Sequence, residues 1–496
     1  MRSPQERRTK IVITIGPASD DEKTIERLIQ TGVNVVRLNF SHGTHAEHLA
    51  RIKRLRTISQ RLERPITILQ DLQGPKIRTG RLAKGSITLV NDQVFYLTGE
   101  PVLGDEHQVS VDFPGVDEYL QPGNRILLDD GKLELVVEAL EGRRIKTRVA
   151  VGGELTSHKG VNLPGIKLEI PSLTEKDEAD LAFGLKHEVD AIALSFVRSQ
   201  MDIVQLRETI SNLSPHLANT PVIAKLEKAE ALENLDKILD AADGVMVARG
   251  DLGVEMSPEE VPIAQKQIIE AANIHAKVVI TATQMLDSMI HNPRPTRAEA
   301  SDVANAIFDG TDAVMLSGET AVGKYPVESV QIMDAIIRKA EDRINRWGHW
   351  RGEFRETPFL GVSTGETTHD DALSITRAAR ELAHDRNVAA IAVFTQTGRT
   401  AQLMAKARPR TPILAFTPIT STYRRLPLLW GVIPHLVPYA DTLEAMLMEV
   451  EKAIMTATPI TPGSQVVLIS GFPVGALCPP NMALLYTLGS FHKSGA

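Results

Sequence analysis

Two charged side chains close a short apolar segment near the middle of the chain. The segment PVIAKLEKAE begins at Pro221, and Lys225 and Glu227 follow its apolar part, two residues apart. Because side chains along a β-strand alternate between its faces, Lys225 and Glu227 are expected to point to the same side at the strand's carboxyl end. Such a pair is often a solvated strand exit. It could instead place an ammonium and a carboxylate together in a site.

Seven other short apolar segments follow the same plan, and the first of them is KIVITIG, which begins at Lys10. The other six end in polar residues: Arg37, Asn39 and Ser41 in NVVRLNFSH, Asp71 in PITILQDLQG, Ser195 and Arg198 in AIALSFVR, Arg249 and Asp251 in GVMVARGD, Thr281, Thr283 and Gln284 in KVVITATQ, and Ser317 and Glu319 in AVMLSGET. Because so many of the predicted strands end in polar residues, these residues are expected to lie together in the fold.

Helical patterns separate most of these segments, as in DEKTIERLIQTG after the first and EEVPIAQKQIIEAANIHA after the sixth. Short, nearly continuous apolar strands that alternate with helices are typical of a parallel sheet. Eight such units predict an α/β fold with a closed (β/α)8 TIM barrel, whose active site lies at the carboxyl ends of the strands. The polar residues are therefore expected to converge on one mouth of the barrel.

The carboxylates of Glu227 and Asp251 end consecutive predicted strands. At one mouth they form a plausible Mg²⁺ pair, because magnesium prefers oxygen ligands and keeps waters or substrate oxygens in its shell. The alternative is a structural ion pair with Lys225 or Arg249.

Other residues at these strand ends suit a phosphorylated substrate. Arg37 could clamp a phosphate. Lys225 could stabilise charge on a transferred phosphoryl group or an enolate, and Thr283 could position a water or relay a proton. The chain has no GxxxxGK[ST] loop and no GxGxxG after a strand, so a nucleotide must be held in another way. Lys159 in SHKGVNLPG is a candidate, with a solvent-exposed lysine as the alternative.

Two regions depart from the barrel pattern. In about ninety residues after DLQGPKIRTG, apolar and polar side chains alternate with period two, which predicts an inserted all-β domain over residues 80–170. A domain inserted at this point of the barrel is placed to act as a lid. The barrel is then expected over residues 1–79 and 171–345. Residues 346–496 predict a linker that begins RWGHWRGEF, followed by an open-sheet α/β domain with helices at 371–384, 399–407 and about 442–455.

Composition limits the possible classes of protein. A chain of 496 residues exceeds one hydrophobic core and predicts two to four domains. The formal charge of −7, without a basic run, argues against a nucleic-acid partner. Cys478 is the only cysteine, which favours a reducing cytoplasm. The basic start MRSPQERRTK precedes too short an apolar stretch for a signal peptide or membrane span, so no membrane association is expected.

Four segments resemble the pyruvate kinase family. They are IAKLEKAEALENLDKILDAADGVMVARGDLGVE, TATQMLDSMIHNPRPTRAEASDVANAIFDGTDAVMLSGETAVGKYP, RLNFSHG and LDDGKLEL. The resemblance runs from about Thr9 to Pro326 and is weaker in the C-terminal domain. It implies transfer of the phosphoryl group of phosphoenolpyruvate to ADP, giving ATP and enolpyruvate, which is protonated to pyruvate. It also implies Mg²⁺ or Mn²⁺, a homotetramer and a phosphorylated allosteric effector.

The resemblance assigns roles to matching positions. Lys225 matches the lysine that stabilises the transition state, Glu227 and Asp251 match the magnesium ligands, and Arg37 matches the phosphate-binding arginine. The phosphoenolpyruvate contacts fall on Gly250, Asp251 and Thr283. The nucleotide contacts fall on Asn39, Arg78 and Lys159, and the monovalent-cation ligands on Asn39, Ser41, Asp71 and the carbonyl of Leu72.

Lys76 in DLQGPKIRTG occupies a position where potassium-dependent members of the family carry glutamate. An ammonium there could reach the cation site and supply its charge, since two cations a few ångströms apart repel each other. We therefore expect the enzyme not to require K⁺. The alternative is a solvated Lys76 with the ion site still in use.

The segment TQTGRT joins a predicted strand to a helix at Thr395–Thr400. Thr395, Thr397, Gly398, Arg399 and Thr400 could form an anion nest, or only an ordinary capped turn. They resemble the family's effector loop, which binds a phosphate of a sugar phosphate or nucleotide. The family's usual Gly-Thr-Asn run is replaced at 479–481 by Pro-Pro-Asn, so the sequence does not identify the effector.

Two rival functions share parts of this pattern. A magnesium-dependent aldolase or lyase acting on a pyruvate enolate would use the same carboxylate pair but would not need Lys159 or the C-terminal domain. A catalytically silent effector-binding protein would keep the fold and lose one of Lys225, Glu227, Asp251 or Thr283, all of which are present. An assay of ATP formation from ADP separates these possibilities.

Overall fold

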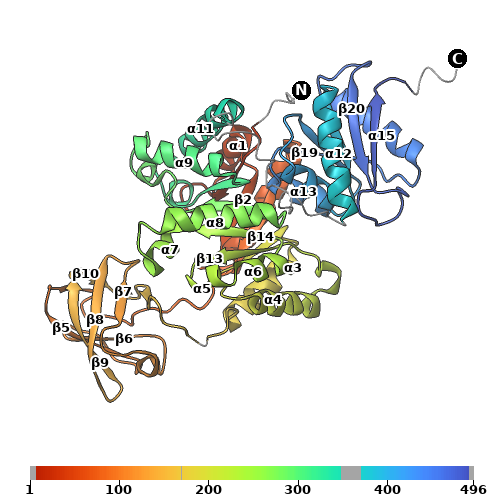
Figure 1. Cartoon of the computed structure of the whole chain (residues 1–496). Coiled ribbons are helices and arrows are strands. Elements are labelled where there is room, and N and C mark those ends of the chain that lie inside the picture. The colour runs from red at the N-terminus through yellow and green to blue at the C-terminus, as the bar shows by residue number, and fades with distance from the viewer. Residues whose placement is uncertain (1–6, 169, 348–369, 491–496) are drawn as a thin grey trace.

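The computed structural model describes residues 7–168, 170–347 and 370–490. It contains a barrel, an inserted β-domain at one end and a C-terminal α/β domain at the other (Figure 1). The fold class expected from the sequence is confirmed. None of the helices described is long and apolar enough to cross a lipid bilayer.

Eight parallel strands close the barrel in the order β1-β16-β15-β14-β13-β12-β3-β2. They are β1 (Lys10–Thr14), β2 (Val35–Asn39), β3 (Thr67–Asp71), β12 (Ala191–Leu194), β13 (Val222–Leu226), β14 (Gly244–Ala248), β15 (Val278–Ala282) and β16 (Ala313–Leu316). Each lies within an apolar segment that predicted it, because nearly every residue of these strands is buried on both faces of the sheet.

Helices follow these strands. They are α1 (Glu22–Thr31), α2 (His45–Arg61), α3 (Glu175–Lys186), α4 (Gln200–Leu213), α5 (Glu230–Glu233), α6 (Leu235–Ala241), α7 (Arg249–Glu255), α8 (Val261–Ile274), α9 (Arg297–Asp309), α10 (Gly318–Ala321) and α11 (Pro326–Trp347). Local chemistry fixes several starts: Thr44 and Thr296 form capping boxes with Glu47 and Glu299.

Two boundaries differ from the expectation. Strand β14 ends at Ala248, so Arg249 and Asp251 lie on the short helix α7 and not on a strand. Helix α11 extends to Trp347, so the first two residues of the expected linker are helical. The rest of that linker, up to residue 369, lies outside the described residues.

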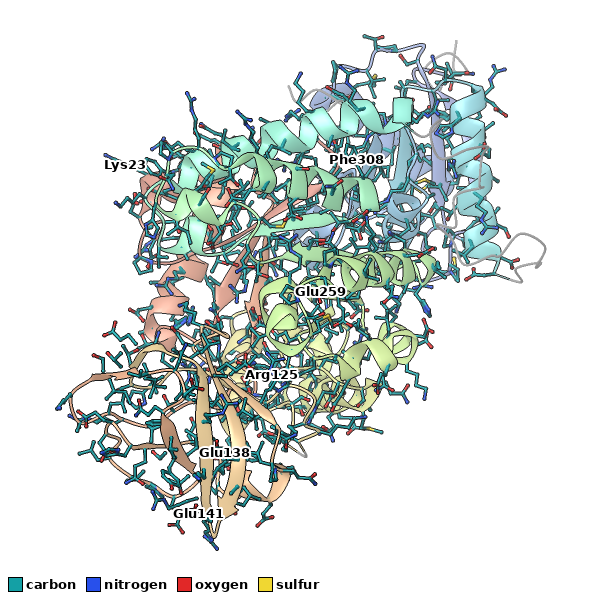
Figure 2. All side chains as sticks on the ribbon, turned by 60° about the vertical axis from the view of Figure 1, so that its left-hand side comes forward. Lys23, Arg125, Glu138, Glu141, Glu259 and Phe308 are labelled. Atoms are coloured by element: carbon teal, nitrogen blue, oxygen red, sulfur yellow. The ribbon has the colours of Figure 1, made fainter. Side chains whose placement is uncertain are left out.

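The inserted domain carries eight strands between β3 and α3. They are β4 (Ser86–Leu89), β5 (Val94–Thr98), β6 (Gln108–Ser110), β7 (Arg125–Leu128), β8 (Leu133–Glu141), β9 (Arg144–Val151), β10 (Gly153–Thr156) and β11 (Val161–Asn162). Its buried residues, including Phe95, Ile126 and Leu135, form a core of their own. Figure 2 shows this domain, with Glu138 and Glu141 labelled, extending away from the barrel.

The C-terminal domain has a five-stranded sheet of order β19-β18-β17-β20-β21. Its elements are α12 (Asp371–Asp385), β17 (Ala390–Phe394), α13 (Arg399–Lys406), β18 (Ile413–Thr417), α14 (Thr420–Arg425), β19 (Val432–Leu436), α15 (Leu443–Ala457), β20 (Gln465–Ser470) and the antiparallel β21 (Met482–Thr487). The two edge strands, β19 and β21, were not predicted. Pro434 interrupts the strand pattern of β19, as is common at an edge.

The C-terminal domain closes the end of the barrel opposite the polar strand ends. One hydrophobic cluster runs from the barrel interior, including Val12, Ile223 and Met315, into Met404 and Trp430 of the C-terminal domain. Hydrogen bonds also join the two domains: Lys10 Nζ donates to the Val432 carbonyl at 2.8 Å, and Thr67 Oγ1 donates to the Arg424 carbonyl at 2.7 Å.

Candidate active site

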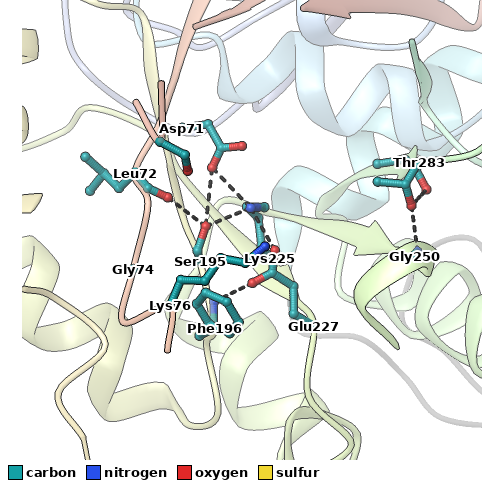
Figure 3. A network of polar contacts seen from close by, with 12 residues as sticks. Asp71, Leu72, Gly74, Lys76, Ser195, Phe196, Lys225, Glu227, Gly250 and Thr283 are labelled. Carbon is teal, nitrogen blue, oxygen red and sulfur yellow. Dashed lines mark hydrogen bonds and ion pairs between the residues drawn. The ribbon is translucent and has the colours of Figure 1, made fainter. Parts of the chain in front are cut away.

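Lys225 is the centre of the polar network at the barrel mouth (Figure 3). Its Nζ lies 2.7 Å from Glu227 Oε1, 2.7 Å from Ser195 Oγ and 3.3 Å from Asp71 Oδ1. These residues come from β13, β12 and β3, so three neighbouring strands deliver them to one point. The sequence prediction that Lys225 and Glu227 lie on the same side is confirmed by their contact.

Burial sets the charges of this network. Burial alone would lower the pKa of Lys225, but the carboxylates of Asp71 and Glu227 raise it above its usual value. Burial would likewise raise the pKa of Asp71, yet Lys225 and Arg37 hold it below its usual range. The pKa of Glu227 is raised, first by burial and then by the nearby Asp251 carboxylate, although Lys225 acts against the shift. We infer a cationic Lys225 beside an ionised Asp71.

Arg37 supplies a second cation next to Asp71. Its Nε donates to Asp71 Oδ2 at 2.5 Å, and its Nη1 donates to Thr14 Oγ1 at 3.0 Å. The side chain is 12% exposed, so part of the guanidinium still faces the mouth. Arg37 and Lys225 thus flank one carboxylate with two positive charges.

The donor set of Glu227 and Asp251 suits a hard divalent cation. Glu227 Oε2 accepts a hydrogen bond from the Phe196 amide at 2.8 Å, which fixes its orientation. Asp251 lies in the first turn of α7, is partly exposed and is near enough to raise the pKa of Glu227. A divalent cation between these oxygens would offset that repulsion and favour the ionised form of Glu227.

Thr283 joins the exit of β15 to the start of α7. Its Oγ1 accepts a hydrogen bond from the Gly250 amide at 2.7 Å and donates to the Ala282 carbonyl at 2.7 Å. Both Thr283 and Gln284 have left-handed backbone conformations, with φ of 66° and 53°. Left-handed φ is rare for a β-branched residue, and such conformations concentrate at functional sites.

The residues expected to form the monovalent-cation site lie around Asp71. Asn39 Oδ1 accepts a hydrogen bond from the Ser41 amide at 3.1 Å, and the Leu72 carbonyl accepts one from Ser195 Oγ at 2.7 Å. Asp71 is already bound to Arg37 and Lys225. Three of the four expected ligands, Asn39, Asp71 and the Leu72 carbonyl, therefore have protein partners.

Lys76 contacts the inserted domain. Its Nζ lies 3.8 Å from Asp130 Oδ1, and its side chain is 30% exposed. This ion pair links the barrel's outgoing connection to the LDDGK turn, which carries Asp129 and Asp130. The expected reach of Lys76 into the cation site stays a prediction.

Arg78 lies on the connection from the barrel to the inserted domain, and Lys159 lies within that domain between β10 and β11. The backbones of Arg78 and Gly160 form an isolated antiparallel β-bridge, and Arg78 Nη1 donates to the His158 carbonyl at 3.1 Å. Lys159 Nζ lies 2.7 Å from Asp129 Oδ1 and is about one third exposed.

Three site residues were not assigned from the sequence. Ser195 links Lys225 to the Leu72 carbonyl, Thr14 binds Arg37, and Asp129 binds Lys159. Ser195 could have been found, because it ends a predicted strand in the same way as Asp71. Asp129 directly follows β7, but that strand belongs to the inserted domain and not to the eight predicted barrel strands.

The segment expected to bind an effector is a turn capped by its own hydroxyls. Thr395 Oγ1 accepts from the Gly398 amide at 3.0 Å, Thr397 Oγ1 accepts from the Arg399 amide at 3.4 Å, and α13 begins at Arg399. Gln396 Nε2 donates to the Val474 carbonyl at 3.3 Å, so the turn contacts the segment before β21.

Comparison with known proteins gives consistent matches. The family profile "Pyruvate kinase, barrel domain" matches residues 6–330, and "Pyruvate kinase, alpha/beta domain" matches residues 373–484. The pyruvate kinase of Geobacillus stearothermophilus is 44% identical over 492 residues, which cover 99% of this chain and 82% of that protein. Pyruvate kinase 2 of Synechocystis is 49% identical over 440 residues, covering 88% and 71%.

A solved structure matches the whole architecture. The crystal structure of a pyruvate kinase from Cryptosporidium parvum superimposes with a TM-score of 0.88 at 34% sequence identity, covering 98% of this chain and 97% of that one. The similarity therefore includes the barrel, the inserted domain and the C-terminal domain.

Proposed function

The chain belongs to the pyruvate kinase family, and we propose that it carries out the family's reaction at the barrel mouth around Lys225. The enzyme is a phosphotransferase that acts on phosphoenolpyruvate and ADP and yields ATP and pyruvate. The bond between phosphorus and the enol oxygen breaks, and a bond to a β-phosphate oxygen of ADP forms. The enolate takes up a proton at its methylene carbon to give pyruvate.

The observation that carries the proposed site is one buried ammonium between two carboxylates. Lys225 is held by Glu227 at 2.7 Å and by Asp71 at 3.3 Å. Phosphoryl transfer depends mainly on positioning and charge stabilisation, so a fixed cation at this point would lower the barrier. Arg37 binds the phosphate of phosphoenolpyruvate through the part of its guanidinium that Asp71 and Thr14 leave accessible.

Gly250, Asp251 and Thr283 make the remaining contacts with phosphoenolpyruvate in this proposal. Thr283 Oγ1 already accepts the Gly250 amide hydrogen and directs its own proton to the Ala282 carbonyl. It would orient a water that protonates the enolate. A direct proton relay through Thr283 would need its hydroxyl to rotate away from Ala282.

We assign Glu227 and Asp251 as the protein ligands of Mg²⁺ or Mn²⁺. When bound, the divalent ion neutralises negative charge on the substrates. Glu227 is held for this role by the Phe196 amide, and Asp251 by its place in the first turn of α7.

Asn39, Arg78 and Lys159 are the proposed nucleotide contacts. Arg78 lies on the connection from the barrel to the inserted domain and Lys159 within that domain, which acts as a lid in this proposal. A lid that closes over the mouth excludes water, which would otherwise accept the phosphoryl group.

The monovalent-cation site comprises Asn39, Ser41, Asp71 and the Leu72 carbonyl, and we propose that Lys76 removes the requirement for K⁺. The proposal rests on the amino-acid type at position 76. It requires the Lys76 side chain to leave Asp130 or to act from there through its charge.

Three further assignments complete the proposal. Thr395, Thr397, Gly398, Arg399 and Thr400 bind a phosphorylated allosteric effector. The enzyme is a cytoplasmic homotetramer. The barrel domain comprises residues 1–79 and 171–345, the lid 80–170 and the C-terminal domain 346–496.

The experiment is a measurement of ATP formation from phosphoenolpyruvate and ADP in the presence of MgCl₂, MnCl₂ or EDTA. ATP is expected only with both substrates and a divalent ion. Addition of ribose 5-phosphate, glucose 6-phosphate or AMP should then raise the rate at low phosphoenolpyruvate. Equal ATP formation with EDTA would disprove the metal assignment, and no response to any of these phosphates would argue against the effector assignment.

A further inference from the structure

Thr283 and Gln284 form an unusual turn at the exit of β15. Both residues are left-handed, and neither is glycine. A conformation of this kind persists only where surrounding contacts hold it, because each residue has a more favourable backbone alternative. The structure must therefore contain a partner that stabilises this turn.

Arg249 is that partner. Its Nη2 donates to the Thr283 carbonyl at 2.8 Å and to the Gln284 carbonyl at 3.3 Å, and its Nε donates to the Ala282 carbonyl at 3.4 Å. The same Nη2 lies 2.7 Å from Met285 Sδ. One guanidinium thus contacts four consecutive residues of the turn.

Asp302 on α9 balances the charge of Arg249. Both of its carboxylate oxygens accept from Arg249 Nη1, at 2.8 and 2.6 Å, and Gln265 Oε1 accepts from the same nitrogen at 3.3 Å. The Arg249 side chain is only 10% exposed. Since its hydrogen-bond donors face the turn, α8 and α9, the cation has a structural neighbourhood distinct from the Lys225 network.

The link between the turn and α7 runs in both directions. Arg249, the first residue of α7, holds the backbone of the turn, and Thr283 Oγ1 in the turn accepts the amide hydrogen of Gly250, the second residue of α7 (Figure 3). The exit of β15 and the start of α7 are therefore fixed relative to each other. A displacement of either would move the other.

We propose that Arg249 is a positioning residue: by holding the left-handed turn, it places the Thr283 hydroxyl against Gly250 and keeps both in the geometry needed for turnover. The inference rests on the proposed function, in which Thr283 and Gly250 contact phosphoenolpyruvate. Lysine cannot replace arginine here. The planar guanidinium of arginine reaches three carbonyls and a carboxylate at once, whereas the ammonium of lysine is a single point charge that cannot contact all four.

The test begins with Arg249→Lys and a matched control. Arg207 on α4 also binds a backbone carbonyl and a carboxylate, Ala241 at 3.1 Å and Asp243 at 2.7 Å, next to the start of β14 at the other end of the barrel. Arg249→Lys should lower kcat by about tenfold to a hundredfold, since small misplacements of reacting groups have effects of that size. Arg207→Lys should retain kcat within about twofold, with both proteins folded by circular dichroism.

A double-mutant cycle identifies the route of the effect. Arg249→Lys is combined with Thr283→Ala, and kcat is measured for the four proteins. If Arg249 acts through Thr283, the lysine variant costs less than about threefold in the Thr283→Ala background. An equal loss in both backgrounds would overturn the proposal, as would near-normal turnover by Arg249→Lys alone.

Two further outcomes keep the failures separate. If Thr283→Ala turns over normally, the proposed role of Thr283 and this inference both fail; if only Arg249→Lys is normal, the role of Thr283 stands. Should Arg249→Lys not fold, Asp302→Asn replaces it in the same cycle, because it removes the countercharge and keeps the shape of the side chain. It should lower kcat at least threefold alone and show the same loss of effect with Thr283→Ala; additive losses would overturn the proposal.

Discussion

Asp71 shows how a single buried carboxylate organises the residues of the mouth. Lys225 and Arg37 both bind it, and the combined positive charge lowers the pKa of Asp71 despite complete burial. A buried charge is stable only when it is paired and hydrogen-bonded. Removing Lys225 or Arg37 would therefore remove one of the charges that lower the pKa of Asp71.

The first prediction concerns the Lys225 ammonium. Lys225→Met keeps most of the side-chain stem and deletes the charge, so turnover should fall by about a hundredfold or more. Lys277→Met is the matched control, because Lys277 Nζ binds the Ala242 carbonyl at 2.7 Å near the other end of the barrel. The measurement is the rate of ATP formation by each of the two folded variants. A Lys225→Met protein as active as the control would refute the assignment.

The second prediction concerns Lys76 and potassium. The unmodified enzyme should be active without K⁺, and Lys76→Glu should create a potassium requirement, because it replaces the ammonium that we propose to stand in for K⁺ by a carboxylate. The same change sets a carboxylate against Asp130, now 3.8 Å from the lysine. Initial rates are measured against KCl at constant ionic strength, with tetramethylammonium chloride as the replacement salt. A large activation of the unmodified enzyme by K⁺ would contradict this reading.

Sequence reasoning found most residues of the mouth and missed how they contact each other. Lys225, Glu227 and Asp71 follow predicted strands, so the fold alone brings them together. The contact of Arg249 with the 282–285 turn could not be foreseen, because no glycine marks a left-handed turn at Thr283 and Gln284. The partner of Lys76 depends on the position of the inserted domain, which no local pattern encodes.

At the scale of elements, the barrel strands were predictable and the edge strands of the C-terminal sheet were not. A strand buried on both faces gives a continuous apolar run, as in β13 and β15. An edge strand such as β19 or β21 is only partly buried, and its mixed sequence carries no clear period. The start of the linker before α12 was set two residues too early, because α11 continues through Arg346 and Trp347.

The third prediction belongs to the connection between β17 and α13. If the hydroxyl-capped turn binds a phosphate, the double variant Thr397→Ala, Arg399→Ala should abolish activation by the phosphorylated metabolite and retain the basal rate. The reason is that the variant removes one hydroxyl and one cation from the turn and leaves the barrel mouth unchanged. The measurement is the rate at low phosphoenolpyruvate against concentrations of ribose 5-phosphate, glucose 6-phosphate and AMP. Unchanged activation would place the effector elsewhere.

At the scale of the whole molecule, α13 is attached to the barrel by its carboxyl end. Lys406 Nζ donates to Asn273 Oδ1 at 2.8 Å and to Asp312, and Arg408 Nη2 lies 2.8 Å from Asp312 Oδ1. Asp312 also accepts the Val279 amide hydrogen at the start of β15. The helix that begins at the proposed effector turn therefore ends on a carboxylate between two barrel strands.

The fourth prediction uses the titration of Lys406. Burial lowers the pKa of Lys406 to about 8 from 10.5, although Asp312 opposes the shift. Between these values the unfolded chain binds more protons than the folded one, so this lysine makes stability rise with pH in that window. The melting temperature of the parent minus that of Lys406→Met should increase by about 1 to 2 °C between pH 7.5 and pH 9.5.

The comparison with Lys406→Met is needed because other groups titrate in the same window. Lys277, for example, also has a pKa lowered by burial, and it is present in both proteins. The difference between the two melting temperatures cancels such shared contributions. A difference that stays constant as pH rises would show that Lys406 keeps an ordinary pKa, and a falling difference would show a raised one; either result would contradict the prediction.

The hydrophobic cluster shared by the barrel and the C-terminal domain has a consequence for synthesis on the ribosome. The eighth barrel strand is complete at Leu316, but Leu426 and Trp430, which belong to the same cluster, follow about 110 residues later. At roughly 5 to 20 residues per second, a nascent barrel waits about 5 to 20 seconds with one apolar end uncovered. During that interval it presents a surface on which chaperones can act, and truncated chains that end before α12 would keep that surface permanently.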